Sequence, residues 1–151
     1  MNGDITGNNG GCLCGARLGR LVTTPSTDQY LLYVEHCSHT GSITGLSAGG
    51  LIGASACAEG IGKAYVRNCN HVGSIQGDSA GGIFAKDCFS KMLGSDSDVI
   101  VERCSSEGNV TTNTYSSGIF GKYCFSDYRP TSNGEQQYAI VRDCVHKGNL
   151  V

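Results

Sequence analysis

The chain has 151 residues, of which 23 are Gly, 9 are Cys, 2 are Pro and none is Trp, and its formal net charge is -2. Hydrophobic residues make up 39% of the chain, which favours a packed core over a disordered tail or linker. The near-neutral charge gives no reason to expect a nucleic-acid partner, and no run approaches the roughly 20 apolar residues needed for membrane insertion. We therefore expect a single domain over residues 1–151.

The first predicted elements lie in residues 3–15, GDITGNNGGCLCG, which match GSITGLSAGGLIG further along the chain. Internal similarity of this kind indicates a repeat protein, and the segment supplies the second half of one copy. From the match we expect Cys14 at the position of Gly53, and Leu13 in line with Ile52.

Three full copies and a partial one follow. They are VEHCSHTGSITGLSAGGLIGASAC (34–57), VRNCNHVGSIQGDSAGGIFAKDC (66–88), VERCSSEGNVTTNTYSSGIFGKYC (101–124) and VRDCVHKGNLV (141–151). The first and second cysteines of a copy lie 20, 19 and 20 residues apart, whereas the next copy begins 9, 13 and 17 residues after the second cysteine. A block of nearly constant length thus alternates with a variable loop, as in arrays of stacked repeats. The expected loops are residues 19–31, 58–63, 89–98 and 125–138.

Each full copy holds three short runs typical of β-strands, with Gly expected at the corners between them. The first run is LYVEH, AYVRN, VIVER or AIVRD, the second GSIT, GSIQ, GNVT or GNLV, and the third AGGLIG, AGGIFA or SSGIFG. With no helical periodicity, the sequence predicts an all-β fold, a three-sided parallel β-helix (solenoid) of about four rungs with variable loops at one corner. The predicted rungs span residues 1–31, 32–63, 64–98 and 99–138, with a partial rung at 139–151.

The pattern C-x-x-x-G-x-[IV]-x-G followed by AGG-[IL]-x-G resembles the glycine-rich GLUG-type repeats of bacterial surface proteins. It is also similar to the AGGI-type repeats in proteins of large DNA viruses. The resemblance covers nearly the whole chain outside the variable loops, and the copy at 108–121 departs from it, with Thr112, Tyr115 and Ser117. What the resemblance implies is a surface, fibre or attachment role.

The aligned copies place one row of charged residues on the outer face of the first run. The row is Glu35, Arg67, Glu102 and Arg142. Opposite charges in register favour a parallel stack, so the alternation of sign supports the alignment. It also leaves no free pair of carboxylates of the kind used by enzymes that cleave glycosidic bonds. We therefore assign no catalytic residues and expect that the protein is not an enzyme.

The first cysteines of the copies form one column, Cys37, Cys69, Cys104 and Cys144. We interpret them as reduced, buried side chains, since free Cys is among the most buried residue types. Disulfides along the column are disfavoured because directly stacked side chains point in parallel, whereas a disulfide needs a dihedral angle near 90°.

Histidines follow two residues later, so Cys37, His39, Cys69 and His71 together form a candidate Cys2His2 zinc site. Ser106 breaks the histidine column in the next copy, and no C-x-x-C spacing is present. The prediction is therefore no metal and no cofactor, with the histidines stacked at the surface or at a corner.

Large apolar residues follow one another directly in the third run. Ile52, Phe84 and Phe120 come after Leu51, Ile83 and Ile119. Consecutive residues of an ideal strand cannot all face inward. One interpretation is that a bulge and the neighbouring Phe89 and Phe125 cover both rows; the other is that Ile52, Phe84 and Phe120 form an exposed docking stripe for a partner.

These features favour a non-catalytic structural or interaction module of a virion or surface fibre, which mediates attachment or end-to-end stacking. Both ends of the chain fall inside a repeat without a recognisable cap, so protein partners or self-association through exposed solenoid ends are expected. A carbohydrate-binding or carbohydrate-cleaving β-helix, with a glycan as partner, is the alternative. The expected location is the virion or the cell surface, with assembly in the cytoplasm if the cysteines are reduced.

Overall fold

The computed structural model describes residues 1–18, 30–59, 62–92, 98–111, 115–126 and 138–151. Within these ranges the secondary structure is all β, with eight strands and no helix. The strands are β1 (Tyr30–Glu35), β2 (Ser38–Thr40), β3 (Lys63–Arg67), β4 (Asn70–Val72), β5 (Val99–Glu102), β6 (Ser105–Glu107), β7 (Ala139–Arg142) and β8 (Val145–Lys147). The variable loops expected from the sequence lie largely outside the described residues, although β1 and β3 begin inside two of them.

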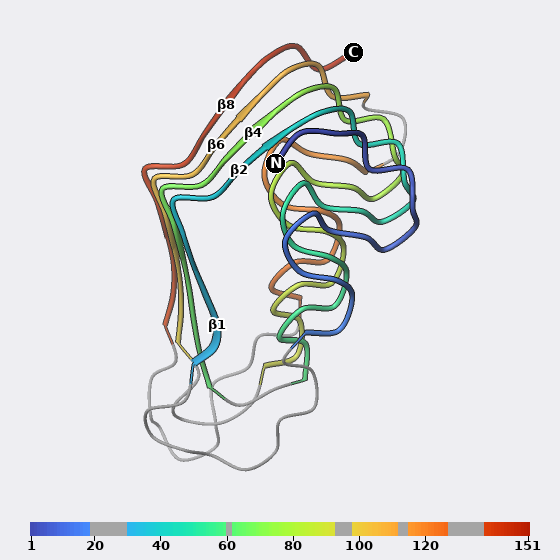
Figure 1. The fold of residues 1–151 in the computed structure, drawn as a ribbon. Coiled ribbons are helices and arrows are strands. Elements are labelled where there is room, and N and C mark those ends of the chain that lie inside the picture. The colour runs from blue at the N-terminus through green and yellow to red at the C-terminus, as the bar shows by residue number, and fades with distance from the viewer. Residues whose placement is uncertain (19–29, 60–61, 93–97, 112–114, 127–137) are drawn as a thin grey trace.

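The strands form two parallel sheets, one with the order β1-β3-β5-β7 and the other with the order β2-β4-β6-β8 (Figure 1). Every strand pairs with the equivalent strand of the next copy, so the copies lie in register. In the first sheet this register brings Val34, Val66, Val101 and Val141 into one row. The predicted parallel pairing of the copies is therefore confirmed.

The second and third runs pair between copies as single bridges instead of longer strands. One series of bridges joins Ile5, Ile43, Ile75, Val110 and Leu150, and another joins Cys14, Ile52, Phe84 and Phe120. Backbone hydrogen bonds accompany both, such as Ile43 N to Ser74 O at 2.8 Å and Phe84 N to Ile119 O at 2.9 Å. These Gly-rich runs bend after one or two residues, which keeps the paired stretches short.

The first copy pairs differently from the sequence prediction. Cys14 bridges Ile52, and the amide of Leu13 donates to the carbonyl of Leu51. The expected alignment of Cys14 with Gly53, and of Leu13 with Ile52, is wrong by one residue. The segments 3–15 and 41–53 have equal lengths, so they align without a gap. In that alignment Cys14 falls at the position of Ile52, and Leu13 at the position of Leu51.

Non-glycine residues turn the corner between the two sheets. His36, Asn68, Arg103 and Asp143 all have φ between 52° and 55°. The prediction of Gly at the corners is wrong here, and Asn, Asp and His tolerate this left-handed conformation better than Arg. The prediction is confirmed at the next corner, where Gly73 has φ +150° and an added Cβ would lie 2.1 Å from the carbonyl oxygen of Gly41.

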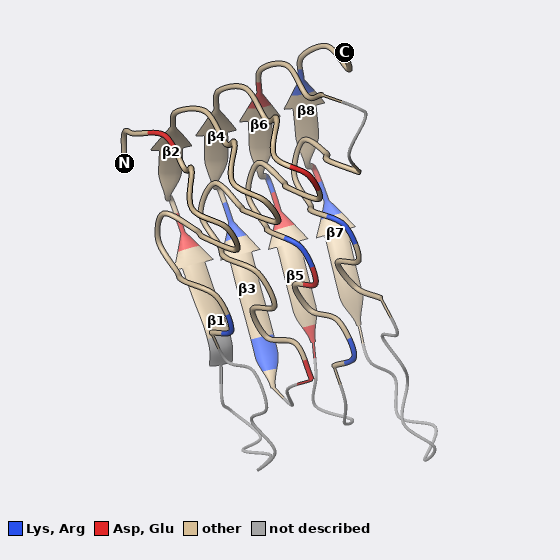
Figure 2. Ribbon diagram, turned by 90° about the vertical axis from the view of Figure 1, so that its right-hand side faces the viewer, with Lys and Arg blue, Asp and Glu red and all other residues tan. Residues whose placement is uncertain are grey.

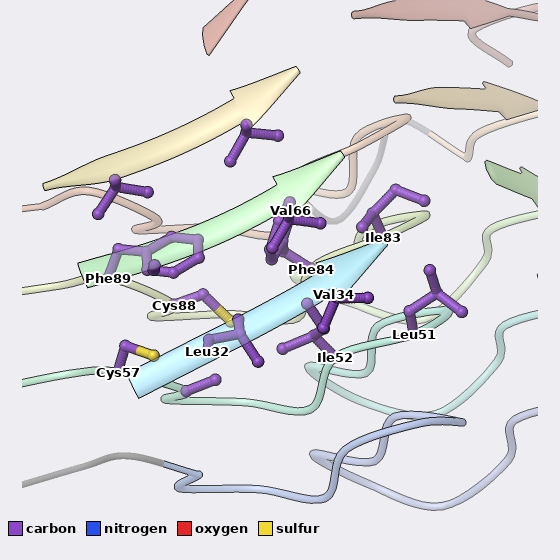
Figure 3. Close-up of a cluster of buried hydrophobic side chains, with 14 of the residues drawn as sticks. Leu32, Val34, Leu51, Ile52, Cys57, Val66, Ile83, Phe84, Cys88 and Phe89 are labelled. Carbon is purple, nitrogen blue, oxygen red and sulfur yellow. The ribbon is translucent and has the colours of Figure 1, made fainter. Parts of the chain in front are cut away.

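The interior holds a large and a small group of buried apolar side chains. The large group combines the inward residues of the first sheet with the third run, and Figure 3 shows Val34, Leu51 and Phe84 within it. The small group belongs to the second run and contains Ile43, Ile75 and Val110. Rows of equivalent residues therefore stabilise each copy against its neighbours.

Candidate functional site: the corner between the two sheets

The strongest polar feature is the row of charges at the ends of β1, β3, β5 and β7. Red and blue alternate along it in Figure 2, and the strand register pairs Glu35 with Arg67, Arg67 with Glu102, and Glu102 with Arg142. The predicted order of the row is confirmed. Arg67 Nε lies 2.9 Å from Glu35 Oε1, and the Tyr33 hydroxyl donates to Glu35 Oε2 at 3.0 Å.

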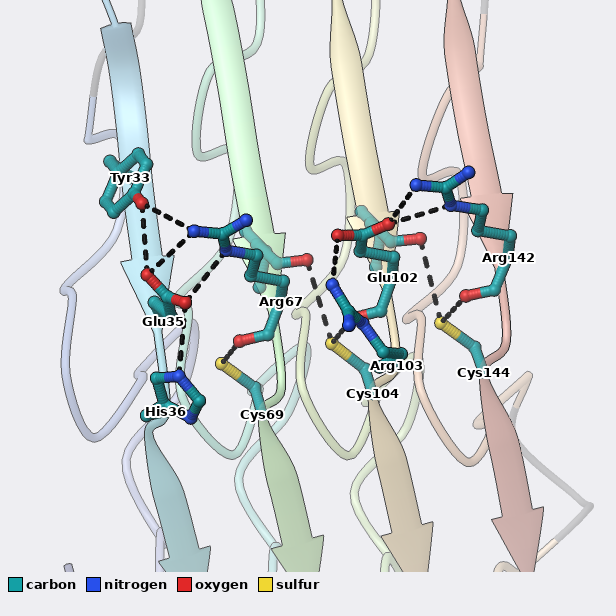
Figure 4. Close-up of polar contacts among 12 residues, drawn as sticks. Tyr33, Glu35, His36, Arg67, Cys69, Glu102, Arg103, Cys104, Arg142 and Cys144 are labelled. Atoms are coloured by element: carbon teal, nitrogen blue, oxygen red, sulfur yellow. Dashed lines mark hydrogen bonds and ion pairs between the residues drawn. The ribbon is translucent and has the colours of Figure 1, made fainter.

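Glu102 is the most deeply buried member of the row. The side chain of Glu102 is only 5% exposed, and Arg142 Nε donates to its Oε2 at 2.7 Å (Figure 4). Arg103 also binds Glu102, at 2.7 Å from Nη2 to Oε1. Arg103 follows Glu102 directly and lies beyond the end of the strand, where the chain turns back toward the carboxylate.

Hydrogen bonds from guanidinium groups fix the charge of both carboxylates. The Arg67 side chain lowers the pKa of Glu35, and the Arg142 side chain, followed by that of Arg103, lowers the pKa of Glu102. A general acid at neutral pH would need a raised pKa instead. In this arrangement the row is suited to holding neighbouring copies together.

The first-cysteine column lies at the same corner, on the interior side. Cys69 and Cys104 are buried, whereas Cys37 and Cys144 are partly buried and pack against the large core group. Each thiol donates to the carbonyl two residues before it, such as Cys69 to Arg67 O at 3.2 Å. All nine cysteines are free. The prediction of buried, unpaired thiols is thus confirmed at the two inner positions.

The histidine column is in the interior, which corrects the prediction of a surface or corner stack. His39 and His71 are both 0% exposed, and their rings stack with centroids 5.1 Å apart. Space for the imidazoles comes from glycines of the third run, because a Cβ at Gly50 would lie 3.1 Å from His71 Nδ1. Ser106 continues the column, fully buried, and its hydroxyl has no hydrogen-bond partner.

The contacts of the His39–His71 pair define its protonation. The two Nδ1 atoms are 2.9 Å apart, His39 Nε2 lies 2.8 Å from Gly3 O, and His71 Nε2 lies 3.1 Å from Gly73 O. Three such hydrogen bonds need three protons, whereas two neutral rings carry two. Two neutral rings can therefore complete only two of these three hydrogen bonds. Burial, and then the neighbouring His39, lower the pKa of His71 to about 4.

The candidate zinc ligands Cys37, His39, Cys69 and His71 do not converge on one point. The cysteine thiols bind carbonyls of their own strands, and the histidines bind each other. Across the described ranges, no group of three or more His, Cys, Asp or Glu side chains could hold a metal ion.

The proposed docking stripe is also in the interior. Ile52 and Phe84 are 0% exposed, and Phe120 is partly buried and stacks on Phe84 at 5.0 Å. Phe89 and Phe125 cover the two phenylalanines edge-on, at 5.2 and 5.4 Å. The exposed-stripe interpretation is wrong, because the chain bends between Leu51 and Ile52 and turns both side chains inward.

No protein-family model, no curated protein and no solved structure matches the chain. Among the described residues, no helix is long and apolar enough to span a membrane.

Proposed function

We propose that the chain is a three-sided parallel β-helix of about four rungs, with its variable loops at one corner, that serves as a non-catalytic structural module. The single observation that carries this proposal is the constant register, in which Glu35, Arg67, Glu102 and Arg142 follow one another across four strands. The resemblance to GLUG-type and AGGI-type repeats agrees with such a module and with a place in a virion or surface assembly.

End-to-end stacking is the proposed mode of assembly. The last strands, β7 and β8, are sheet edges, and side chains of the interior rows are exposed there, with Val141 at 46% and Leu150 at 68%. A further rung would cover these side chains and pair the free backbone groups, as each copy does for the one before it. Contacts of this head-to-tail kind generate open filaments.

Sedimentation velocity and negative-stain electron microscopy over a range of protein concentrations would test the assembly. We expect concentration-dependent growth that Val141→Lys abolishes, because a charge would enter the stacking face. Ile140→Lys is the matched control, since Ile140 has similar exposure but belongs to the outer row with Tyr65 and Ile100. A monomer at every concentration would contradict end-to-end stacking.

Carbohydrate binding is the second candidate, favoured by one observation on the outer face of the first sheet. Tyr33 stacks on Tyr65 with ring centroids 6.3 Å apart, beside Glu35 and Arg67. Flat aromatic rings next to polar groups are suited to the faces and hydroxyls of sugars. Glycan-array binding that is lost in Tyr33→Ala would support this candidate. Binding is favoured over cleavage, because the row's carboxylates are already held by arginines.

A further inference from the structure

The column of first cysteines is held in register by the backbone. The residue after each cysteine of one copy donates its amide hydrogen to the preceding copy's cysteine carbonyl. These bonds are Asn70 N to Cys37 O at 3.0 Å, Ser105 N to Cys69 O at 2.9 Å and Val145 N to Cys104 O at 3.0 Å. Neighbouring thiols are therefore spaced by the distance between parallel strands, roughly 4.8 Å.

The two inner thiols are neighbours along the column, and both lie in a dry environment. Cys69 is 1% exposed and Cys104 is 0% exposed. Figure 4 shows both sulfurs on the same side of the corner, with Cys144 continuing the line.

This geometry disfavours a disulfide but suits a metal ion with two ligands. A disulfide needs a Cβ···Cβ distance of about 3.8 Å and a dihedral angle near 90°. Parallel side chains from adjacent strands satisfy neither condition. Two thiolates on opposite sides of one cation need a sulfur–sulfur distance of roughly 4.6 Å, twice a typical metal–thiolate bond of about 2.3 Å, and impose no dihedral angle.

We propose that the thiols of Cys69 and Cys104 form a two-coordinate site for a thiophilic monovalent cation, with Cu+ as the ion. Soft thiolate ligands select Cu+, whereas Zn2+ prefers four ligands. The absence of any three-ligand group in the described part of the chain is consistent with a site that needs only two.

Binding of Cu+ displaces protons from the thiols. Cu+ forms one bond to each sulfur, the two thiols release up to two protons to solvent, and no electron is transferred. The proposal does not depend on the assembly role.

The test is an anaerobic titration of the reduced protein with Cu+ held by a chromophoric chelator of known affinity. We expect the chain to withdraw one tightly bound equivalent, and Cys104→Ser to weaken that binding at least tenfold. Cys88→Ser is the matched control, since it removes an equally buried thiol, the second cysteine of its copy, and should keep the site. X-ray absorption of the bound ion should show two sulfur ligands at roughly 2.2 to 2.3 Å.

Equal withdrawal of Cu+ by Cys104→Ser and the unaltered chain would overturn the proposal. So would an absorption spectrum with nitrogen ligands or with three or more sulfurs. If Cys104→Ser does not fold, Cys69→Ser removes the same pair from the other side, and the spectrum of the unaltered protein decides the ligand number by itself.

Discussion

Burial of His71 makes the stability of the fold depend on pH. Its pKa is about 4 in the folded chain, mainly because burial disfavours the charged ring, against 6.5 in the unfolded chain. Between these values the unfolded chain binds a proton that the folded chain excludes, so the free energy of unfolding decreases as the pH falls. At about 1.36 kcal/mol per pKa unit, the loss is about 3 kcal/mol over the whole interval.

The variant His71→Ser isolates this contribution, because it copies Ser106, which the next copy carries at the paired position. Urea denaturation between pH 7 and pH 4.5 gives the free energy of unfolding of both chains. The variant should be less stable at pH 7, since His39 loses its Nδ1 partner, and the difference should shrink by about 2 to 3 kcal/mol on acidification. The lowered pKa values of Glu35 and Glu102 place their own losses below this pH range.

Parallel pH profiles of the two chains would refute the reasoning, because they would mean that His71 binds its proton equally in both states. A difference that widens on acidification would refute it in the other direction. In that case the folded chain would take up the proton and complete the third hydrogen bond of the His39–His71 pair.

Three further predictions concern packing and charge. Phe84→Ala should lower the free energy of unfolding by about 3 to 5 kcal/mol in chemical denaturation, because it empties the centre of the aromatic cluster. Gly50→Ala should cost about 3 kcal/mol, since its Cβ would lie 2.0 Å from Gly82 O, whereas the control Gly15→Ala, with nothing within 4 Å, should change stability by less than about 0.5 kcal/mol. Glu102→Gln should lower the thermal midpoint at pH 7, and this effect should shrink as the pH falls below 4.5. The reason is that a lowered carboxyl pKa adds stability above the ordinary value of 4.5 and loses it as the pH falls through the folded value.

The sequence alone was sufficient to predict which residues share a row in the first sheet. The alternation of Glu35, Arg67, Glu102 and Arg142 predicts a register that places opposite charges side by side, and the structure has that register. The positions of the single bridges in the second run follow from the same alignment, because Ile43 and Ile75 occupy equivalent places after a Gly.

The histidine column could not be predicted by polarity, because His is usually found in partly exposed positions. Strand alternation gave the better signal. In β2 the neighbours Ser38 and Thr40 face solvent, so His39 between them has to face inward. The glycines of the third run, such as Gly50, leave room for the rings because they carry no side chain.

The alternating row of charges has a consequence for how such a chain can change in length. Removing residues 66–100, one whole copy unit, would bring Glu35 beside Glu102, two like charges on neighbouring strands. Removing or adding two units restores the match of opposite signs at every step. The unit of growth by duplication, and of shortening by deletion, is therefore a pair of copies, so arrays built on this corner should favour even changes in copy number.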